Sequence, residues 1–337
     1  MRDKIVVTGF GIVSSLGVGI EKNKEALLKG RKSIGRVSHI DTLHTNLPCG
    51  EVRESDDELR AMVGVNPDTV ITRNPLLAMV ALKEAIETSG LTDATPTAFI
   101  NGTTVGGMEK SERFYRDFFK GEKTEYITAH DCGNGTEMAS RLFGHFEYMT
   151  TVSTACSSAA NSIILGADMI KTQRVEAAIV GGSESLSKFH LNGFNSLMIL
   201  EKEPCKPFNR NNNGLNLGEG AAFIVIESES SAKKRGAKIL CELSGYANCC
   251  DAYHQTATSP ESTGEVLAMT KALEDANLQC SDIDYINAHG TGTPDNDLHE
   301  SLAIQKVFGE TIPPFSSTKS YTGHTTSAAG GLEAVFS

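Results

Sequence analysis

Basic residues are not in excess in this sequence: 31 lysines and arginines stand against 42 aspartates and glutamates, a formal net charge of −11. Such an acidic chain is poorly suited to bind nucleic acid through bulk charge. No apolar run approaches the roughly 18 residues of a membrane-spanning helix, and the first, beginning at Ile5, is interrupted by Thr8, Gly9 and Gly11. We therefore predict no nucleic-acid partner, no signal peptide and no membrane insertion, and we expect a cytoplasmic protein.

The eight cysteines form no C-x-x-C pair. In a chain of 337 residues, scattered cysteines indicate reduced thiols rather than a disulfide framework. The cysteines and histidines also lack the ligand spacing of a zinc site, so we expect no metal. Two glycine-rich stretches, residues 9–14 and 214–220, lack the third glycine of a dinucleotide fingerprint and the lysine of a phosphate loop, respectively. We interpret both as tight turns.

Short β-rich runs alternate with helical stretches along the chain, whose length suits about two domains. The predicted strands cover residues 5–8, 98–101, 151–154, 177–181, 221–226 and 285–288. The clearest predicted helices cover residues 76–88, 159–170 and 264–276, and residues 51–58 and 205–217 are predicted to be loops. The alternation predicts an α/β fold with helices packed on the faces of sheets.

A repeat relates the two halves of the chain. A predicted helix and the strand that ends at Asn101 match a later helix and strand around Asn287, 186 positions further on, and both helices open with Ala-Met. Ser153, which opens Ser-Thr-Ala-Cys before a helix rich in small residues, matches Ser317, which opens Ser-Thr-Lys-Ser 164 positions further on. Two matches in the same order favour a duplicated fold.

The second copy of the repeat is shorter than the first. The first continues with the predicted strands at 177–181 and 221–226, whereas the second stops at Ser337, in a helix without a glycine or proline stop signal. We therefore expect the second half to be truncated.

Cys156 is the first candidate for chemistry. It lies between a predicted strand and a helix that begins with small residues, which places its sulfur near a helix N-terminus. Unpaired backbone amides and the helix dipole there favour a thiolate, and about 1 kcal/mol from the helix end would lower the thiol pKa by less than one unit. The alternative is a small buried hydrophobic side chain.

Two histidines occupy comparable places. His289 ends a predicted strand and begins a turn with Gly290 and Gly292, whose lack of side chains allows a ligand to approach the backbone. His324 lies between a predicted strand and the small-residue helix of the second copy. The repeat puts Cys156 and His324 on equivalent strand-to-helix turns, the place where α/β folds carry their chemistry. Either histidine alone could instead be structural.

With these three residues in view, the chain resembles the elongating 3-oxoacyl-[acyl-carrier-protein] synthases, the beta-ketoacyl synthases of the thiolase-like fold. The matching stretches span essentially the whole chain: residues 6–14, 153–158, 218–221, 251–254, 287–294 and 316–330. The resemblance implies two duplicated α/β halves in a layered α-β-α-β-α arrangement. It places an N-terminal half at residues 1–240 and a C-terminal half, incomplete, at residues 241–337.

The family's reaction, as the resemblance implies it, is a decarboxylative Claisen condensation. A cysteine, here Cys156, takes an acyl group from a carrier thioester, and malonyl-acyl-carrier protein then loses CO2 to give an enolate that attacks the acyl-enzyme. His289 and His324 would donate hydrogen bonds to the enolate oxygen, Lys319 would orient the site, and Glu333 would support it. The Cys156 backbone amide would supply half of an oxyanion hole. No cofactor is implied.

The resemblance also assigns substrate contacts. Thr291 and Thr293 resemble the contacts to the phosphopantetheine arm, and Phe194 and Val105 resemble acyl-pocket positions.

The chain departs from the family at several positions. Gly292 stands where serine is usual, and Thr325 and Thr326 replace a commonly apolar pair, so we expect a pocket that favours unusual acyl groups. Asn212 stands where arginine is common, a position that bears on how the carrier docks. A glycine-rich, phenylalanine-containing segment that follows the last helix in the family is missing from this sequence, and we expect weak or no activity of this form.

The implied partners are acyl carrier protein, bearing phosphopantetheine-linked acyl and malonyl groups, and a second copy of the chain in a homodimer. Two alternatives are a non-catalytic partner subunit that sets chain length beside an active ketosynthase, and a degradative thiolase. Such partner subunits generally lack the nucleophile, and a thiolase would show a second catalytic cysteine near the C-terminus. Cys156 with both histidines and Lys319 therefore favours the condensing enzyme.

Overall fold

The computed structural model describes residues 3–211, 213–254 and 258–337. All eight cysteines are free thiols, as the sequence predicts. Within the described residues, no helix has both the length and the apolar character needed to cross a membrane.

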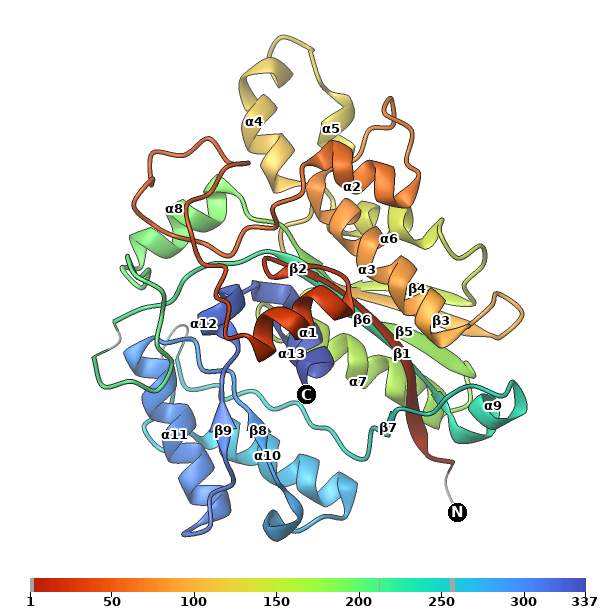
Figure 1. Ribbon diagram of the computed structural model, residues 1–337, viewed down its shortest axis with the longest axis vertical. Coiled ribbons are helices and arrows are strands. Elements are labelled where there is room, and N and C mark those ends of the chain that lie inside the picture. The colour runs from red at the N-terminus through yellow and green to blue at the C-terminus, as the bar shows by residue number, and fades with distance from the viewer. Residues whose placement is uncertain (1–2, 212, 255–257) are drawn as a thin grey trace.

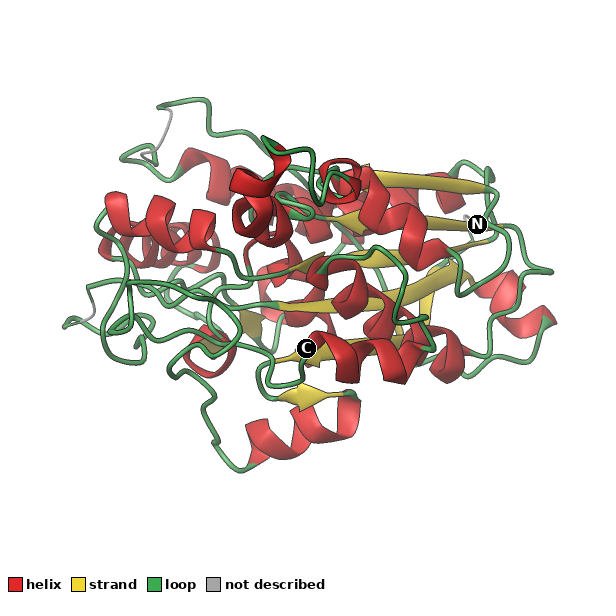
Figure 2. Ribbon diagram, turned by 90° about the horizontal axis from the view of Figure 1, so that it is seen from above, coloured by secondary structure: helices red, strands yellow, loops and turns green. Residues whose placement is uncertain are grey.

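A mixed seven-stranded sheet forms the centre of the described structure (Figure 1), with strand order β2-β1-β6-β5-β3-β4 and β7 paired to β1. Its strands are β1 (Ile5–Ser14), β2 (Gly17–Val18), β3 (Thr97–Gly102), β4 (Tyr148–Val152), β5 (Ala177–Glu184), β6 (Gly220–Ser228) and β7 (Cys241–Glu242). A smaller sheet pairs β8 (Ile286–Asn287) with β9 (Phe315–Ser316). Figure 2 shows the strands of the large sheet side by side, with most of the long loops gathered beyond one end.

Helices surround both sheets. They are α1 (Ile20–Leu28), α2 (Asp56–Val63), α3 (Arg73–Ser89), α4 (Met108–Phe118), α5 (Glu125–Thr128), α6 (Cys132–Ser140), α7 (Ser158–Lys171), α8 (Lys188–Ser196), α9 (Glu229–Lys234), α10 (Thr263–Ala276), α11 (Pro294–Phe308), α12 (Lys319–Thr322) and α13 (Ala329–Phe336), with short 3-10 turns η1 (Cys280–Asp282) and η2 (Thr326–Ala328).

The large sheet is buried on both faces, which is why its strands are apolar at nearly every position. On β5, Ala177 and Ile179 face the core beneath α3, whereas Ala178 and Val180 face the core beneath α7. α13 packs beside α7 on that second face, through the cluster that contains Leu332. The two faces together give the sheet its rigidity and fix the strand ends that carry the site.

The layers follow the order expected for a duplicated fold. Figure 1 shows, from the upper right to the lower left, α3, the large sheet, α7 with α13, the small sheet, and α11. β3 pairs in parallel with β4, and β8 pairs in parallel with β9, so each half places a parallel strand pair before its small-residue helix. The predicted repeat is therefore a real correspondence in topology.

The tight-turn interpretation of residues 9–14 is wrong, because they continue β1 to Ser14. A Cβ on Gly9 would lie 2.5 Å from Ser89 Cβ, and one on Gly11 would lie 2.1 Å from Ala81 O, so these glycines let α3 cross closely over the strand. Residues 214–220 are not a tight turn either: Leu215 and Leu217 form isolated β-bridges.

The remaining predictions of elements are mostly confirmed, with shifts at the boundaries. Residues 51–58 are not all loop, because α2 begins at Asp56. Ser55 and Glu58 form a capping box, a sequence signature of a helix start that the loop prediction overlooked. The strand predicted at 151–154 lies at Tyr148–Val152, since the chain turns before Cys156.

Candidate active site

Cys156 lies in the short connection between β4 and α7. Ala155, immediately before it, has a φ of 52°, a left-handed conformation that is uncommon for a residue with a Cβ. Ser158 Oγ stabilises this turn by donating to Ala155 O (2.7 Å) and accepting from Thr154 N (2.8 Å). The turn places Cys156 at the N-terminal end of α7, as the sequence predicts.

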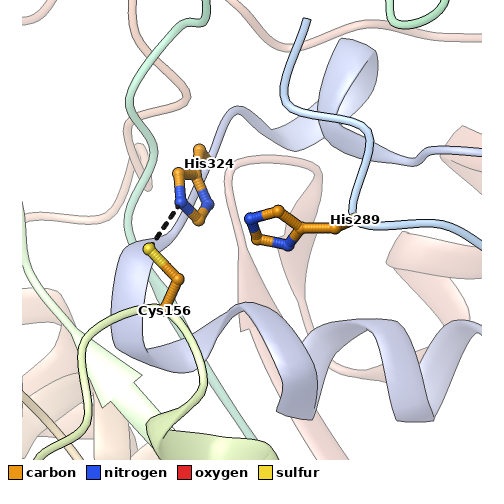
Figure 3. Close-up of side chains that lie close together, drawn as sticks. All are labelled: Cys156, His289 and His324. Atoms are coloured by element: carbon orange, nitrogen blue, oxygen red, sulfur yellow. Dashed lines mark hydrogen bonds between the residues drawn. The ribbon is translucent and has the colours of Figure 1, made fainter. Parts of the chain in front are cut away.

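Burial raises the pKa of the Cys156 thiol, although the Lys319 ammonium opposes the shift. The expected net lowering of this pKa is therefore wrong, because burial outweighs the lowering by Lys319 and by the backbone N–H of Cys156. The Cys156 sulfur lies 3.0 Å from His324 Nε2 (Figure 3). A neutral thiol at this distance can pass its proton to the imidazole as it attacks a substrate.

His324 is held by its own backbone. Its N–H donates to Asn216 O (2.7 Å), and its carbonyl accepts from Gly218 N (2.9 Å), which forms the β-bridge with the stretch misread as a tight turn. Gly323 has a φ of 75°, and a Cβ there would lie 2.5 Å from Leu217 O. Only glycine fits this close approach, so the packing of Leu217 against residue 323 requires a glycine immediately before His324.

His289 follows β8 and is anchored from α11. The Glu300 carboxylate accepts from His289 N (2.6 Å) and from Gly290 N (2.7 Å). The His289 ring lies 5.1 Å from the His324 ring, at an interplanar angle of 88°, and Figure 3 shows both rings turned toward the same space beside Cys156.

Lys319 lies behind His289 and is only 2% exposed. Its ammonium donates to His289 O (2.6 Å), lies 3.4 Å from His289 Nδ1, and pairs with Glu333 on α13. Burial, with the Lys319 charge adding to it, lowers the pKa of both imidazoles well below their usual range. Burial raises the pKa of Glu333, with Lys319 opposing. Both histidines are therefore neutral near pH 7.

The side chains of Cys156, His289 and His324 could together hold a soft metal cation. Cys156, His289 and His324 offer ligand atoms that lie within 4.8 Å of one another, and a cysteine with two histidines is a donor set that suits zinc. The Lys319 ammonium beside His289 repels a second cation, which favours a hydrogen-bonding role for the two rings. The absence of a metal stays a prediction.

The two predicted phosphopantetheine contacts lie in the turn between β8 and α11. Thr291 and Thr293 are 5% and 9% exposed, and their hydroxyls are 3.0 Å apart. Thr293 is the N-cap of α11, whose proline at the first turn and acidic Asp295 suit a helix start. They share the turn of His289, but contact with substrate stays a prediction.

The predicted acyl-pocket residues come from two other elements. Phe194, on α8, is partly buried against the cluster of Leu186, Leu191 and Leu217. Val105 follows β3, and its N–H points to the Glu184 carboxylate at 3.4 Å. Their roles stay predictions, and Asn212 lies outside the described residues.

Sequence reasoning missed Glu300 and Glu184. Glu300 lies eleven residues after His289, and a helix that begins at Pro294 brings it back over the histidine turn, so the helix start was a usable signal. Glu184 ends a strand with no motif around it, and only the structure shows how many donors meet its carboxylate.

A cavity of about 1170 Å³ lies away from these residues, beside α4 and α8. Its wall carries a buried charge network in which Arg73 pairs with Glu219 (2.7 Å) and Asp56 (3.0 Å). Burial raises the pKa of Glu109, on the same wall, to about 7. Its lining does not include Cys156, His289 or His324, which distinguishes it from the Cys156 site.

Two family models match this chain. The model described as "Beta-ketoacyl synthase, N-terminal domain" matches residues 2–232, and "Beta-ketoacyl synthase, C-terminal domain" matches residues 240–337. The chain is 34% identical over 351 residues to "3-oxoacyl-[acyl-carrier-protein] synthase 2" of Staphylococcus aureus (strain COL), and this match covers 99% of the chain and 84% of the relative.

Solved structures show the same fold. "The ishigamide ketosynthase/chain length factor" matches with a TM-score of 0.92 and 31% identity, covering 99% of this chain and 85% of that one. A type II PKS acyl-carrier protein in complex with its ketosynthase bound to the hexaketide matches with a TM-score of 0.86 and 25% identity, covering 100% and 86%. The fold is thus the thiolase-like fold of ketosynthases.

Proposed function

Because the chain belongs to the beta-ketoacyl synthase family, we propose that it joins an acyl group on Cys156 to a malonyl group on acyl carrier protein, giving 3-oxoacyl-acyl-carrier protein and CO2. It is an acyltransferase of the condensing type. The observation that carries the proposal is the convergence of Cys156, His289 and His324 within 4.8 Å of one another.

The first step is acyl transfer. Cys156 Sγ forms a bond to the carbonyl carbon of the acyl thioester, and the thiol proton moves to His324 Nε2, 3.0 Å away. The carrier's phosphopantetheine sulfur leaves and takes up that proton. The result is an acyl-Cys156 thioester and a free carrier thiol.

The second step is decarboxylation. The bond between the malonyl carboxylate and the α-carbon breaks, CO2 leaves, and the electron pair becomes an enolate whose charge lies on the thioester oxygen. Two neutral imidazole N–H groups, from His289 and His324, stabilise that oxygen in a buried site. A protonated pair beside Lys319 would place three positive charges together, which the lowered pKa values avoid.

The last step forms the carbon–carbon bond. The enolate carbon attacks the acyl-Cys156 carbonyl, the tetrahedral intermediate collapses, and the Cys156 thiolate leaves and takes a proton from water. Lys319 acts through His289, since its ammonium binds the His289 carbonyl oxygen at 2.6 Å and fixes the ring's place. Glu333 partly balances the buried ammonium.

Trapping of Cys156 tests the proposal. Incubation with an acyl-carrier thioester should add one acyl mass to the intact protein, and peptide mapping should place it on Cys156. Cys205, a fully buried thiol that donates to Lys319 O (3.5 Å), is an internal control that should stay unmodified. A wild-type protein that never acylates Cys156 but raises the activity of a separate ketosynthase would instead be the chain-length partner subunit.

Acyl carrier protein is the proposed donor of both substrates, supported by the carrier complex of the similar ketosynthase. We also propose that the halves divide at residues 240 and 241, close to the matched ranges 2–232 and 240–337. Fatty acid or related acyl-chain elongation is the proposed pathway, and cytoplasmic location stays a prediction.

A homodimer is the proposed assembly. β4 ends the large sheet with one edge unpaired among the described residues, and Met149 on it is 41% exposed. An edge strand of this kind is a ready template for pairing with another chain. Tyr115 on α4 and Phe119, the residue that follows α4, are also exposed and form a T-shaped pair at 5.2 Å.

A further inference from the structure

Glu184 is a fully buried carboxylate at the last position of β5, with 0% of its surface exposed. Removing a carboxylate from water is costly unless hydrogen bonds replace its hydration. Here the replacement comes from amides and hydroxyls, which arrive from two different parts of the site.

The Oε1 atom of Glu184 faces the first half of the chain. It accepts from Thr103 Oγ1 (3.0 Å), from Asn74 Nδ2 (3.3 Å) and from Val105 N (3.4 Å). These donors belong to the loop after β3 and to the start of α3. Val105 is a predicted acyl-pocket residue, so this oxygen fixes the backbone of one pocket wall.

The Oε2 atom of Glu184 joins that loop to the segment after His324. It accepts from Thr104 N (3.0 Å) and from the Thr104 hydroxyl, and also from Ser327 Oγ (2.5 Å) and Thr326 Oγ1 (3.5 Å). Thr326 and Ser327 lie in η2, which begins two residues after His324. One carboxylate therefore connects the pocket loop with the turn that carries the histidine.

The turn after His324 is strained. Thr326 has a φ of 44°, a left-handed conformation that is a clear outlier for a β-branched residue. Such strain persists only where the surrounding structure holds it. The contacts that hold this turn from the other half of the site include the hydrogen bonds from Thr326 and Ser327 to Glu184 and a bond from Ser327 Oγ to Ser183 O (3.3 Å).

We propose that Glu184 is a positioning residue for the condensation, which keeps the His324 ring in place beside the His289 ring by holding the strained turn after His324 against the pocket loop. This inference rests on the proposed function. Glu184 would affect the decarboxylation step through the position of His324, without touching the substrate.

Glutamine cannot replace the carboxylate at this position. Its NH2 group would face the Val105 N–H if it took the Oε1 place and the Thr104 N–H if it took the Oε2 place. Hydroxyl groups can rotate to accept, but a backbone N–H cannot. Either orientation of the amide in Glu184→Gln therefore pushes the loop after β3 away from the turn after His324. A displacement of about 1 Å at a reacting group can lower the rate about 100-fold.

The first experiment measures CO2 release from malonyl-acyl-carrier protein in the Cys156→Gln background, where acyl transfer is absent. Adding Glu184→Gln should lower kcat at least 10-fold, with KM changed less than 3-fold. The matched control is Glu227→Gln, a fully buried carboxylate paired with Arg235 far from the site, which should leave kcat per folded molecule within 2-fold. Far-UV circular dichroism gives the folded fraction.

A second pair of variants covers the case in which Glu184→Gln does not fold. Ser327→Ala removes one donor to the carboxylate and should lower the decarboxylation kcat about 3-fold to 10-fold by loosening the turn, a loss within the usual range for coupled neighbours. Its control is Ser162→Ala, a fully buried serine that bonds only the Gly181 backbone and the Ala159 carbonyl, and whose kcat should stay within 2-fold of wild type.

The outcomes separate the two proposals. If the wild-type protein makes no 3-oxoacyl product, the proposed function fails. If it does, and both Glu184→Gln and Ser327→Ala release CO2 at the rate of their controls, the positioning role of Glu184 is overturned. A combined variant that loses less than the product of the two separate losses would show that Glu184 acts through Ser327.

Discussion

Lys319 is the residue on which most of the site's electrostatics depends. It is buried, pairs with Glu333, binds the His289 carbonyl, and adds to the lowering of the pKa of both imidazoles. Removing one partner of a buried ion pair leaves an uncompensated charge and typically costs about 3–5 kcal/mol. The neutral histidines are therefore consequences of burial beside one cation, whereas the protonated thiol follows from burial that this cation opposes.

Glu109, on the wall of the polar cavity, offers a pH test at the scale of one side chain. Burial raises its pKa to about 7; Oε1 accepts from Arg73 N (2.6 Å), and Oε2 is buried without a partner among the described residues. Because the folded pKa lies above the unfolded value, the folded state binds more protons between these two values. Its contribution to stability is present at low pH and is lost as the pH rises through about 7.

Glu109→Gln should therefore raise the free energy of unfolding at pH 8 by about 1–3 kcal/mol, since an amide keeps the bond to Arg73 N without the charge. The gain should shrink toward pH 5. Urea denaturation at both pH values measures it, with Glu25→Gln on exposed α1 as a control that gains nothing. An equal gain at both pH values would contradict the raised pKa.

At the scale of elements, the contact between α7 and β5 depends on a helix glycine. A Cβ on Gly166 would lie 2.5 Å from Val180 Cγ1 and 3.1 Å from Ala178 Cβ. Gly166→Ala should destabilise the protein by about 1–3 kcal/mol despite the better helix propensity of alanine.

Gly193 on α8 is the matched control for that variant, because a Cβ there meets nothing within 4 Å. Gly193→Ala should be neutral or stabilise by about 0.5–1 kcal/mol. Thermal melts of both variants give the comparison. If Gly166→Ala melts at the wild-type temperature, the close packing of α7 on the sheet is not as described.

The elements were largely predictable because both periodicity and repeat were visible in the sequence. Apolar runs predicted β5 and β6, and the repeat predicted that Cys156 and His324 occupy equivalent strand-to-helix turns. The close approach of α3 to β1 was not predictable. Gly9 and Gly11 indicated a turn in the sequence, yet they lie within the strand that α3 crosses. The pKa of Cys156 was also out of reach, because burial depends on how the halves pack.

For the whole molecule, the open edge of β4 predicts that two copies pair in solution. Light scattering after size exclusion should give twice the chain mass of 36.0 kDa. Met149→Lys puts a charge on the edge strand and should shift the mass toward one copy. Leu28→Lys, at an exposed site on α1, is the control that should remain a dimer. A wild-type monomer would contradict the assembly.

The measurement that tests the central claim most directly is CO2 release from malonyl-acyl-carrier protein by three proteins side by side. The wild type, supplied also with carrier protein that bears an acyl group, should release one CO2 for each 3-oxoacyl product. Cys156→Gln should still release CO2 but make no product, and His324→Ala should do neither, because the enolate loses a hydrogen-bond donor. Undiminished CO2 release by His324→Ala would contradict the account.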